Sequence, residues 1–384
     1  MLHQLAGKEV DGREIIWSPY YRVDFIPKDR DISVNSISHQ GMLSHGSQGI
    51  AYALPYLLSQ DSGRRPVQDV LIIGAGSGND TSAALAAGAL RVDAVEIDPA
   101  ILSLGKHHHP DRPYQDARVK VHAADGRNFL KETDRKYDVI VYALVDSLIL
   151  HSGYSSIRLE NFLFTQQAFA DVKDRLKPGG LFVMYNYYRQ GWIIERLQRM
   201  AADTFGQKPL IFNLPYRAEI PADITNTKTD ESTFTMVLAG DTEPIRKAFD
   251  GSETGFWIPK RDYLNDNRSI GFGVSPSPQD HRDWVRIGPS AVAASAAGEA
   301  LPADHWPFLY TKNRQIPGFA LRGIALMGGL SLLILWVFTP KGTGRFNWTL
   351  FFLGAGFMLL ETKSVVHLAL LFGSTWIVHS IVFF

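Results

Sequence analysis

The chain has 384 residues, more than a single hydrophobic core usually holds, so two or three structural units are expected. Lys plus Arg and Asp plus Glu number 39 each, and this balance gives no overall charge that would attract nucleic acid. The absence of cysteine excludes disulfides, thiolate nucleophiles and cysteine-ligated metal sites.

The first 60 residues mix short β-type runs with turn residues, and they lack the long apolar core of a signal peptide. Strands are indicated at Glu14–Trp17 and Tyr21–Ile26, with the turn Ser18-Pro19 between them. Residues 1–60 are therefore predicted to form a small β-rich domain, and nothing at the front of the chain directs export.

Strand-like and helix-like segments alternate through residues 61–240, a pattern that produces a parallel sheet flanked by helices. A helix is expected from Asn161 to Leu176, ended by the Pro and Gly residues at 178–180. The fold class is therefore predicted to be α/β, with a Rossmann-like sheet. Runs apolar enough for buried parallel strands lie at 69–74, 91–97, 119–124, 137–144 and 180–188.

The last third of the chain changes in composition. Residues 241–316 are rich in Gly, Pro, Ser and Ala and are predicted to be a loosely structured connector. Gly318–Phe338 is long and apolar enough to cross a bilayer, and 346–384 suits one or two further spans. Residues 317–384 are thus predicted to be a transmembrane region. Because the chain ends on apolar residues without a polar flank, it is expected to be a fragment of a longer protein.

A glycine-rich turn follows the first strong strand. Gly74, Gly76 and Gly78 occur at alternate positions before a helix-like stretch, 79–87. Glycines allow a tight turn and a close approach to a ligand, while the helix N-terminus supplies free N–H groups. The spacing is GxGxG rather than GxGxxG, which weakens an NAD-binding interpretation. Taken alone, the motif is also compatible with a plain structural turn.

Acids follow the next two predicted strands. Glu96 ends the second strand, where a carboxylate can accept hydrogen bonds from both ribose hydroxyls of a nucleotide. Asp125, followed by Gly126, comes after the third strand, where an acid can accept from an exocyclic adenine amine. Together with the glycine turn, they line the carboxyl edge of the sheet, where ligands bind in open α/β folds. A solvated acid or a helix cap is the alternative for either residue alone.

Asp146 follows the fourth strand and is the candidate for accepting a proton from an attacking amine. A loop acid or helix cap is the competing interpretation. The run His107–His109 is predicted to be a solvated loop, because adjacent histidines cannot easily converge on one metal ion. No metal site is therefore expected.

Six segments carry a resemblance to the spermidine synthase-like family. They are WSPYYRVD, IIGAGSGND, VEIDP, AADGRNFL, KYDVIVY and LKPGGLFV, and they fall in the family's order and spacing from about Trp17 to Gly240. The resemblance implies a class I methyltransferase fold behind a small N-terminal β-domain. It also implies a donor substrate, S-adenosylmethionine or its decarboxylated form. The residues implied to bind it are Gln40, Gly74, Gly76, Gly78, Glu96, Asp98, Asp125 and Gly126.

The chain departs from the polyamine synthases on the acceptor side. It has Ser77 where they carry an acid in the glycine loop, and Ala143 with Asp146 where they carry a paired Asp-x-x-Asp. No Asp or Glu lies between Gln40 and Asp61, so the family's Tyr-x-Glu element is also missing. Each lost carboxylate removes a partner for a cationic diamine, which disfavours putrescine as the acceptor.

The leading hypothesis is a membrane-anchored transferase that moves an aminopropyl or methyl group to an unidentified small-molecule or lipid-proximal acceptor. One alternative is a non-catalytic donor-binding sensor coupled to a membrane domain. Another is a component of a membrane transport system, motivated by Glu361 beside Lys363 in apolar sequence. The segment Asp304–Trp306 is interpreted either as part of an acceptor site near the bilayer or, for Trp306, as an interfacial aromatic residue.

The segment DHWPFLYTKNRQIP and the apolar tail are similar to the membrane-bound bacterial branch of the family. This similarity implies an integral protein of the bacterial inner membrane. Basic residues flank the first span on both sides, so the charge rule for orientation is nearly tied. The soluble part is placed in the cytoplasm because the implied nucleoside donor is cytosolic. No nucleic-acid partner is expected, and a homo-oligomer is left open.

Overall fold

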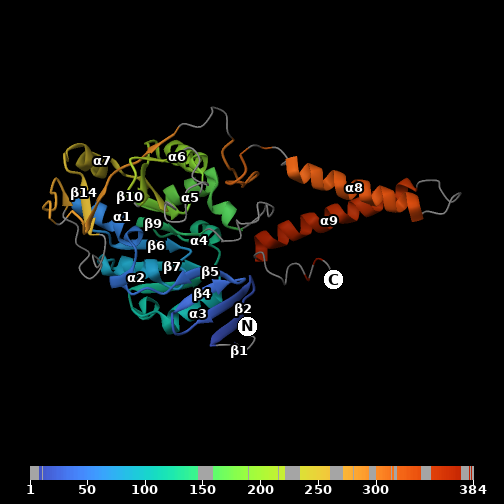
Figure 1. Cartoon of the computed structure of the whole chain (residues 1–384), viewed down its shortest axis with the longest axis horizontal. Coiled ribbons are helices and arrows are strands. Elements are labelled where there is room, and N and C mark those ends of the chain that lie inside the picture. The colour runs from blue at the N-terminus through green and yellow to red at the C-terminus, as the bar shows by residue number, and fades with distance from the viewer. Residues whose placement is uncertain are drawn as a thin grey trace. The chain divides into compact units, whose positions relative to one another are not determined.

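A computed structural model gives the structure of the chain (Figure 1). It divides into two compact units, one of residues 1–297 with 301–309 and one of 298–300 with 310–384. The residues that the structure describes are 8–10, 12–145, 159–188, 190–214, 216–220, 234–259, 271–279, 281–293, 300–312, 314, 318–338, 347–372, 380 and 382.

An antiparallel sheet of five strands in sequential order forms the N-terminal part. Its strands are β1 (Lys8–Val10), β2 (Arg13–Trp17), β3 (Arg22–Ile26), β4 (Asp31–Val34) and β5 (Ile37–Gly41). Phe25 and Ile32 pack against Ile101 and Leu104 of helix α3 (Pro99–His108) in one buried cluster, so this sheet shares a core with the α/β part.

The sequence predicts β structure up to residue 60, whereas a short 3-10 helix η1 (His45–Ser47) and helix α1 (Ile50–Asp61) follow β5. The helix is apolar on nearly every side, and its residues from Ala53 to Ser59 are all buried. Such a run has no clear helical period, because burial on all faces removes the polar stripe that would reveal it.

The large sheet has seven strands in the order β11-β13-β10-β9-β6-β7-β8. The five predicted strands are all present and pair in parallel. They are β6 (Asp69–Ile73), β7 (Arg91–Glu96), β8 (Val119–Ala123), β9 (Tyr137–Ala143) and β10 (Leu176–Asn186).

The far edge of this sheet corrects the prediction of a parallel sheet. Strands β11 (Leu210–Leu214) and β13 (Phe234–Gly240) belong to it, and β13 lies between β10 and β11 and is antiparallel to both. All residues of β11 are buried. An apolar run in the sequence indicates that a strand is buried, but it does not indicate the direction of the strand. That direction depends on how the chain turns back to the sheet.

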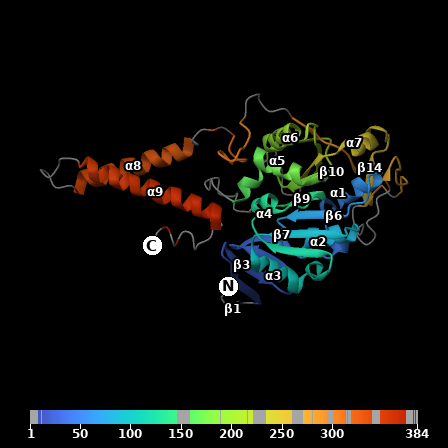
Figure 2. The same cartoon turned by 180° about the vertical axis from the view of Figure 1, so that it is seen from behind.

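Helices fall into two groups that can be followed in Figures 1 and 2. Helix α1 contacts α2, whereas α4, α5 and α6 contact one another in series. Their bounds are α2 (Asn79–Ala86), α4 (Gly126–Glu132), α5 (Gln166–Arg175) and α6 (Gly191–Phe205), with a short 3-10 helix η2 (Pro113–Gln115) after α3.

The helix predicted at 161–176 is confirmed in its centre and wrong at both ends. A 3-10 turn η4 (Leu159–Leu163) comes first, and α5 begins after Thr165, whose hydroxyl accepts from the Ala168 N–H at 3.1 Å. At the other end β10 already starts at Leu176, so the Lys-Pro-Gly-Gly segment lies in the strand.

The prediction of a loose connector over 241–316 is wrong for much of its described part. Helix α7 (Glu243–Asp250) is followed by a three-stranded sheet in the order β15-β14-β16. Phe256 and Ile287 of this small sheet are buried in the main core. A few apolar residues thus order a segment whose overall composition is that of a linker. The remaining strands are β12 (Glu219–Ile220), β14 (Phe256–Pro259), β15 (Gly271–Phe272), β16 (Trp284–Ile287) and β17 (Ala291–Val292).

The second unit contains two long apolar helices, α8 (Gly318–Phe338) and α9 (Trp348–Phe372). The bounds of α8 are those predicted from the sequence. Within the described residues, the stretch Leu321–Phe338 is the one helix that is long and apolar enough to cross a membrane by length and composition.

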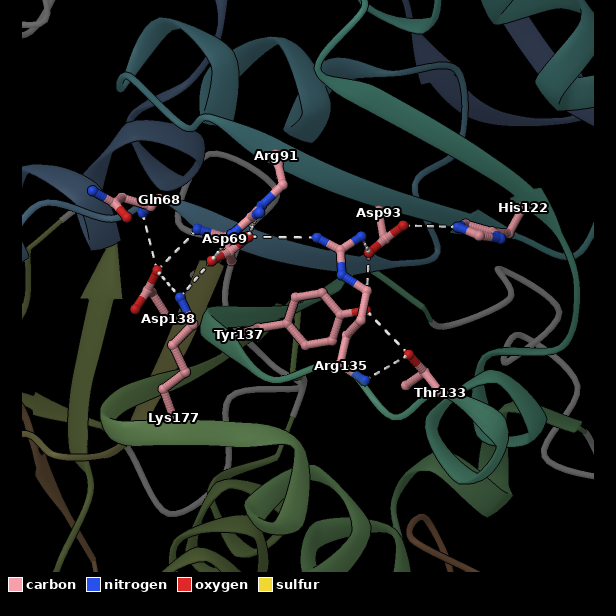
Figure 3. Close-up of polar contacts among 10 residues, drawn as sticks. All are labelled: Gln68, Asp69, Arg91, Asp93, His122, Thr133, Arg135, Tyr137, Asp138 and Lys177. Carbon is pink, nitrogen blue, oxygen red and sulfur yellow. Dashed lines mark hydrogen bonds and ion pairs between the residues drawn. The ribbon is translucent and has the colours of Figure 1, made fainter.

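Charged side chains join the beginnings of the parallel strands (Figure 3). Asp69, at the start of β6, accepts from Arg91 Nε at 2.5 Å and from Lys177 Nζ at 2.5 Å. Lys177 Nζ also lies 2.9 Å from Asp138 Oδ2, so one ammonium joins the starts of three strands. We call the whole set the amino-edge network: Asp69, Arg91, Asp93, His122, Arg135, Tyr137, Asp138 and Lys177.

Candidate functional site

The glycine loop and the acid after the second strand are in direct contact at the carboxyl edge of the sheet. The N–H of Gly76 donates to Glu96 Oε2 at 2.9 Å, and the N–H of Asp98 donates to Glu96 Oε1 at 3.0 Å. Burial raises the pKa of Glu96, against the lowering effect of these N–H donors. Because each carboxylate oxygen can accept a second hydrogen bond, Glu96 remains able to accept from a ligand's hydroxyls.

A glutamine from the N-terminal sheet closes on the same loop. The N–H and the hydroxyl of Ser77 both donate to Gln40 Oε1, at 2.9 and 2.8 Å. Gly76 has a φ of +56°, and a Cβ at this position would lie 2.7 Å from Gln40 Oε1. A side chain at residue 76 would therefore push Gln40 away from the loop and strain the backbone.

The other predicted donor-binding acids cap helices at this edge. Asp98 Oδ1 accepts from the Ala100 N–H at 2.8 Å and caps α3, and Asp125 Oδ1 accepts from the Asn128 N–H at 2.9 Å and caps α4. Burial raises the pKa of both acids. A cap does not exclude a ligand contact, because a carboxylate has about four acceptor positions.

Gly126, the first residue of α4, lies against the end of β6. A Cβ on Gly126 would come within 2.3 Å of Ile73 Cγ2, so a larger residue would push α4 away from the sheet. Gly78, which precedes α2, has a φ of +114°. The roles of these two glycines in donor binding stay predictions.

Two tyrosines of this edge are absent from the predicted set. The pKa of Tyr20 is raised to about 12 by burial and by the negative charges of Asp98, Asp125 and Glu96, which places its phenol near all three acids. Tyr114 donates from its hydroxyl to the carbonyl oxygen of Gly76 at 2.8 Å. Tyr20 lies in the segment WSPYYRVD, but the sequence of that segment does not show which strand ends of the large sheet Tyr20 faces.

The histidine run corrects the expectation of a solvated loop. His107 and His108 are the last residues of α3, and His109 is buried, with its Nε2 3.1 Å from Asn79 Oδ1. Asn79 also accepts from the Leu43 N–H at 3.0 Å. The buried His109 therefore helps to hold the start of α2 against the segment that leads out of the N-terminal sheet.

Asp146, the predicted proton acceptor, lies outside the described residues, and its role stays a prediction. The chain just before it is described. A Cβ on Gly74 would lie 2.5 Å from Val145 Cγ1 and 3.2 Å from the carbonyl oxygen of Ala143. The end of β9 therefore runs directly past the first glycine of the loop.

The segment Asp304–Trp306 is folded onto the α/β part. Asp304 Oδ1 accepts from the hydroxyl of Thr165 at 2.6 Å, and its Oδ2 lies 3.2 Å from Arg127 Nη2. Trp306 lies near the fully buried Arg196, whose guanidinium carbon is 5.9 Å from the centre of the indole ring. These contacts tie the segment to helices α4, α5 and α6.

The strand order, the glycine loop after the first parallel strand and the acids after the next two define a class I methyltransferase-like domain. Residues 36–230 match the family model described as the spermine/spermidine synthase domain. The match covers half of the chain, and the chain belongs to this family.

The curated relatives are named polyamine aminopropyltransferases. The protein from Korarchaeum cryptofilum is 28% identical over 156 residues, which cover 39% of this chain and 44% of the relative. The protein from Escherichia fergusonii is 33% identical over 128 residues, 31% of this chain and 40% of the relative. The matched stretch thus spans less than half the length of these relatives.

Solved structures with some similarity include spermidine synthase from Thermotoga maritima. It matches with a TM-score of 0.42 and 14% identity, covering 84% of this chain and 88% of the other.

Proposed function

We propose that this chain is a membrane-anchored aminopropyltransferase, with decarboxylated S-adenosylmethionine as donor and an amine as acceptor. The observation that carries the proposal is the hydrogen bond from the Gly76 N–H to Glu96, because it brings the glycine loop and the ribose-binding acid together. Membership of the spermine/spermidine synthase domain family supports this function, as do the names of the curated relatives.

In this proposal the carboxyl edge binds the adenosine part of the donor. Glu96 accepts hydrogen bonds from the two ribose hydroxyls, and Asp125 accepts from the adenine amine. Gly76 allows the backbone to approach the ligand closely. Gln40 and Tyr20 come from the N-terminal sheet and the turn between its strands, so they close the site from the other side.

The transfer itself needs alignment and one base. The lone pair of the acceptor nitrogen attacks the propyl carbon bonded to the sulfonium, so a C–N bond forms as the C–S bond breaks. The bonding pair stays on sulfur, which becomes a neutral thioether, and the extra proton on nitrogen passes to a base. Asp146 is proposed as that base, because it follows the strand that passes Gly74.

The test uses the whole chain purified in detergent. Isotopically labelled S-adenosylmethionine and its decarboxylated form are each incubated with a set of amines, and products are identified by mass spectrometry. We expect an aminopropyl product from the decarboxylated donor, lost in Asp146→Asn while donor binding remains. Methyl transfer would reassign the donor, and donor binding without any transfer would favour the sensor hypothesis. A chain that binds neither donor would refute the proposal.

We also propose that α8 anchors the chain in a membrane. Its 21 residues correspond to a length of about 30 Å, the thickness of a bilayer's hydrocarbon core. Large apolar side chains such as Leu326 and Trp336 are 69% and 80% exposed, and none of the apolar window is buried within the protein. Burial in lipid would remove this surface from water.

Extraction of expressing cells with alkaline carbonate tests the anchor. The wild-type chain should stay in the membrane pellet, whereas a variant with Leu326→Arg and Leu333→Arg should move toward the supernatant. Release of the wild-type chain would argue against membrane insertion.

Glu361 and Lys363 lie within α9, and unchanged amine transport on Glu361→Gln would count against the transport hypothesis.

A further inference from the structure

Asp80, the second residue of α2, is partly buried and lies beside the candidate site. Tyr185 of β10 donates its hydroxyl to Asp80 Oδ1. Among the residues that the structure describes, no cation forms an ion pair with Asp80, unlike the acids of the amino-edge network. A carboxylate that is partly removed from water and has a neutral phenol as its partner is costly, so a positively charged ligand would find a strong partner here.

Aromatic rings surround this acid and continue to the surface. Tyr52 of α1 makes an edge contact with Tyr185, with ring centres 6.2 Å apart. Phe234 lies 5.3 Å from Tyr185 and 4.9 Å from Tyr187, and Tyr187 is 50% exposed. Ammonium groups bind well to the faces of aromatic rings, and a carboxylate behind such rings adds a charge partner.

The cluster also adjoins the place where transfer is proposed. Tyr185 pairs with Ala143 in the neighbouring strand β9, whose end runs past Gly74. Asp80 is two residues after Gly78, the last glycine of the loop. An amine bound by this cluster would therefore lie close to the glycine loop and to the end of β9.

We propose that Asp80, with Tyr52, Tyr185, Tyr187 and Phe234, binds the ammonium group of a cationic amine acceptor. This inference rests on the proposed aminopropyl transfer. It assigns to Asp80 the role of the acceptor-side carboxylates that the sequence lacks in the glycine loop and between Gln40 and Asp61. Asp80 is thus a specificity-determining residue, because a neutral acceptor would gain nothing from its charge.

The titration of Asp80 is consistent with this role. Burial raises its pKa to about 7, while the hydrogen bond from Tyr185 works in the opposite direction. The titratable groups that face it are Tyr52 and Tyr56 of α1, Tyr114 of η2 and Tyr185 itself, all with pKa values raised by burial. Near neutral pH, Asp80 is therefore the group among them that changes its charge.

The experiment measures donor and acceptor separately on the whole chain in detergent. Donor affinity is obtained by calorimetry with decarboxylated S-adenosylmethionine. Acceptor KM is then obtained with putrescine and spermidine, and butanediol serves as the neutral probe. Asp80→Asn keeps the side-chain shape, and Asp24→Asn is the control for a buried acid that has its own cation, Arg22.

We expect Asp80→Asn to raise the amine KM at least tenfold at pH 8 with donor affinity unchanged, and Asp24→Asn to leave both unchanged. Tyr187→Ala, at an exposed position, should raise the amine KM several-fold without affecting folding. An unchanged amine KM in Asp80→Asn would overturn the inference, as would a wild-type chain that binds donor but neither amine. Failure to bind donor would instead remove the proposed function, and this inference with it.

Discussion

Both edges of the large sheet carry acidic residues, but the surroundings of these acids shift their pKa values in opposite directions. At the amino edge, hydrogen bonds from Arg91 and Lys177 hold the pKa of Asp69 near 2, although burial works against them. At the carboxyl edge, burial raises the pKa of Glu96 and of Asp80, and the groups that bond to them are N–H donors or a phenol. Acids that are already neutralised by cations stabilise the fold, whereas acids without cations remain available to a ligand.

Gly76→Val should have the largest effect on donor binding at the carboxyl edge. The new side chain would displace Gln40, whose Oε1 would lie 2.7 Å from its Cβ, and it would strain a backbone with φ of +56°. We expect donor affinity to fall more than ~100-fold, about 3 kcal/mol, in calorimetry. Gly63→Val is the control, because φ is +73° there and a Cβ would meet nothing within 4 Å. Similar losses in both variants would show that backbone strain, and not the contact with Gln40, is responsible.

Asp69→Asn should act on stability alone. It removes the charge that Arg91 and Lys177 share, and we expect the free energy of unfolding to fall by about 2 kcal/mol. Chemical denaturation measures this, and donor affinity should not change. Asp116→Asn, which breaks an exposed pair with Arg118, should cost less than ~0.5 kcal/mol. A loss of donor binding in Asp69→Asn would contradict the division between the two edges.

Glu96→Gln should weaken the donor site with a smaller effect. Both carboxylate oxygens accept from backbone N–H groups, so an amide must turn its NH₂ toward one of them, at Gly76 or Asp98. We expect donor affinity to fall about tenfold, or ~1.4 kcal/mol, by calorimetry. Unchanged affinity would mean that Glu96 positions the loop without contacting the ribose.

The pH dependence of stability should run in opposite directions at the two edges. The pKa of Asp69 falls from 3.8 to about 2 on folding, so its contribution is complete above pH 4 and is lost as the pH falls toward 2. The pKa of Asp80 rises from 3.8 to about 7, so its contribution is complete below pH 4 and is lost as the pH rises through 7.

Asp80→Asn should therefore stabilise the chain at pH 8, by about 1 kcal/mol in chemical denaturation, and change little at pH 4. Tyr185→Phe removes the phenol that donates to Asp80 and serves as the comparison, because it should lower stability at pH 8. A lower stability of Asp80→Asn at pH 8 would contradict the raised pKa.

Local sequence signals predicted the elements that local hydrogen bonding and apolar patterning define. The strands β6 to β10 are apolar runs ended by turn residues, and α8 is a long apolar stretch in which Arg322 is the one charged residue, so each can be identified without knowledge of its neighbours. The antiparallel strands β11 and β13 are not predicted. Their place in the sheet depends on how the chain turns back to it, which a short sequence window does not show.

By itself, the sequence determined that a glycine loop follows the first parallel strand and that acids follow the next two. Tertiary structure alone decided which side chains meet there. Gln40 reaches Ser77 across 37 residues of sequence, and Tyr185 reaches Asp80 across 105. Such contacts depend on the order and register of the strands. Order and register are determined by the packing of the whole core, so no local sequence pattern predicts these contacts.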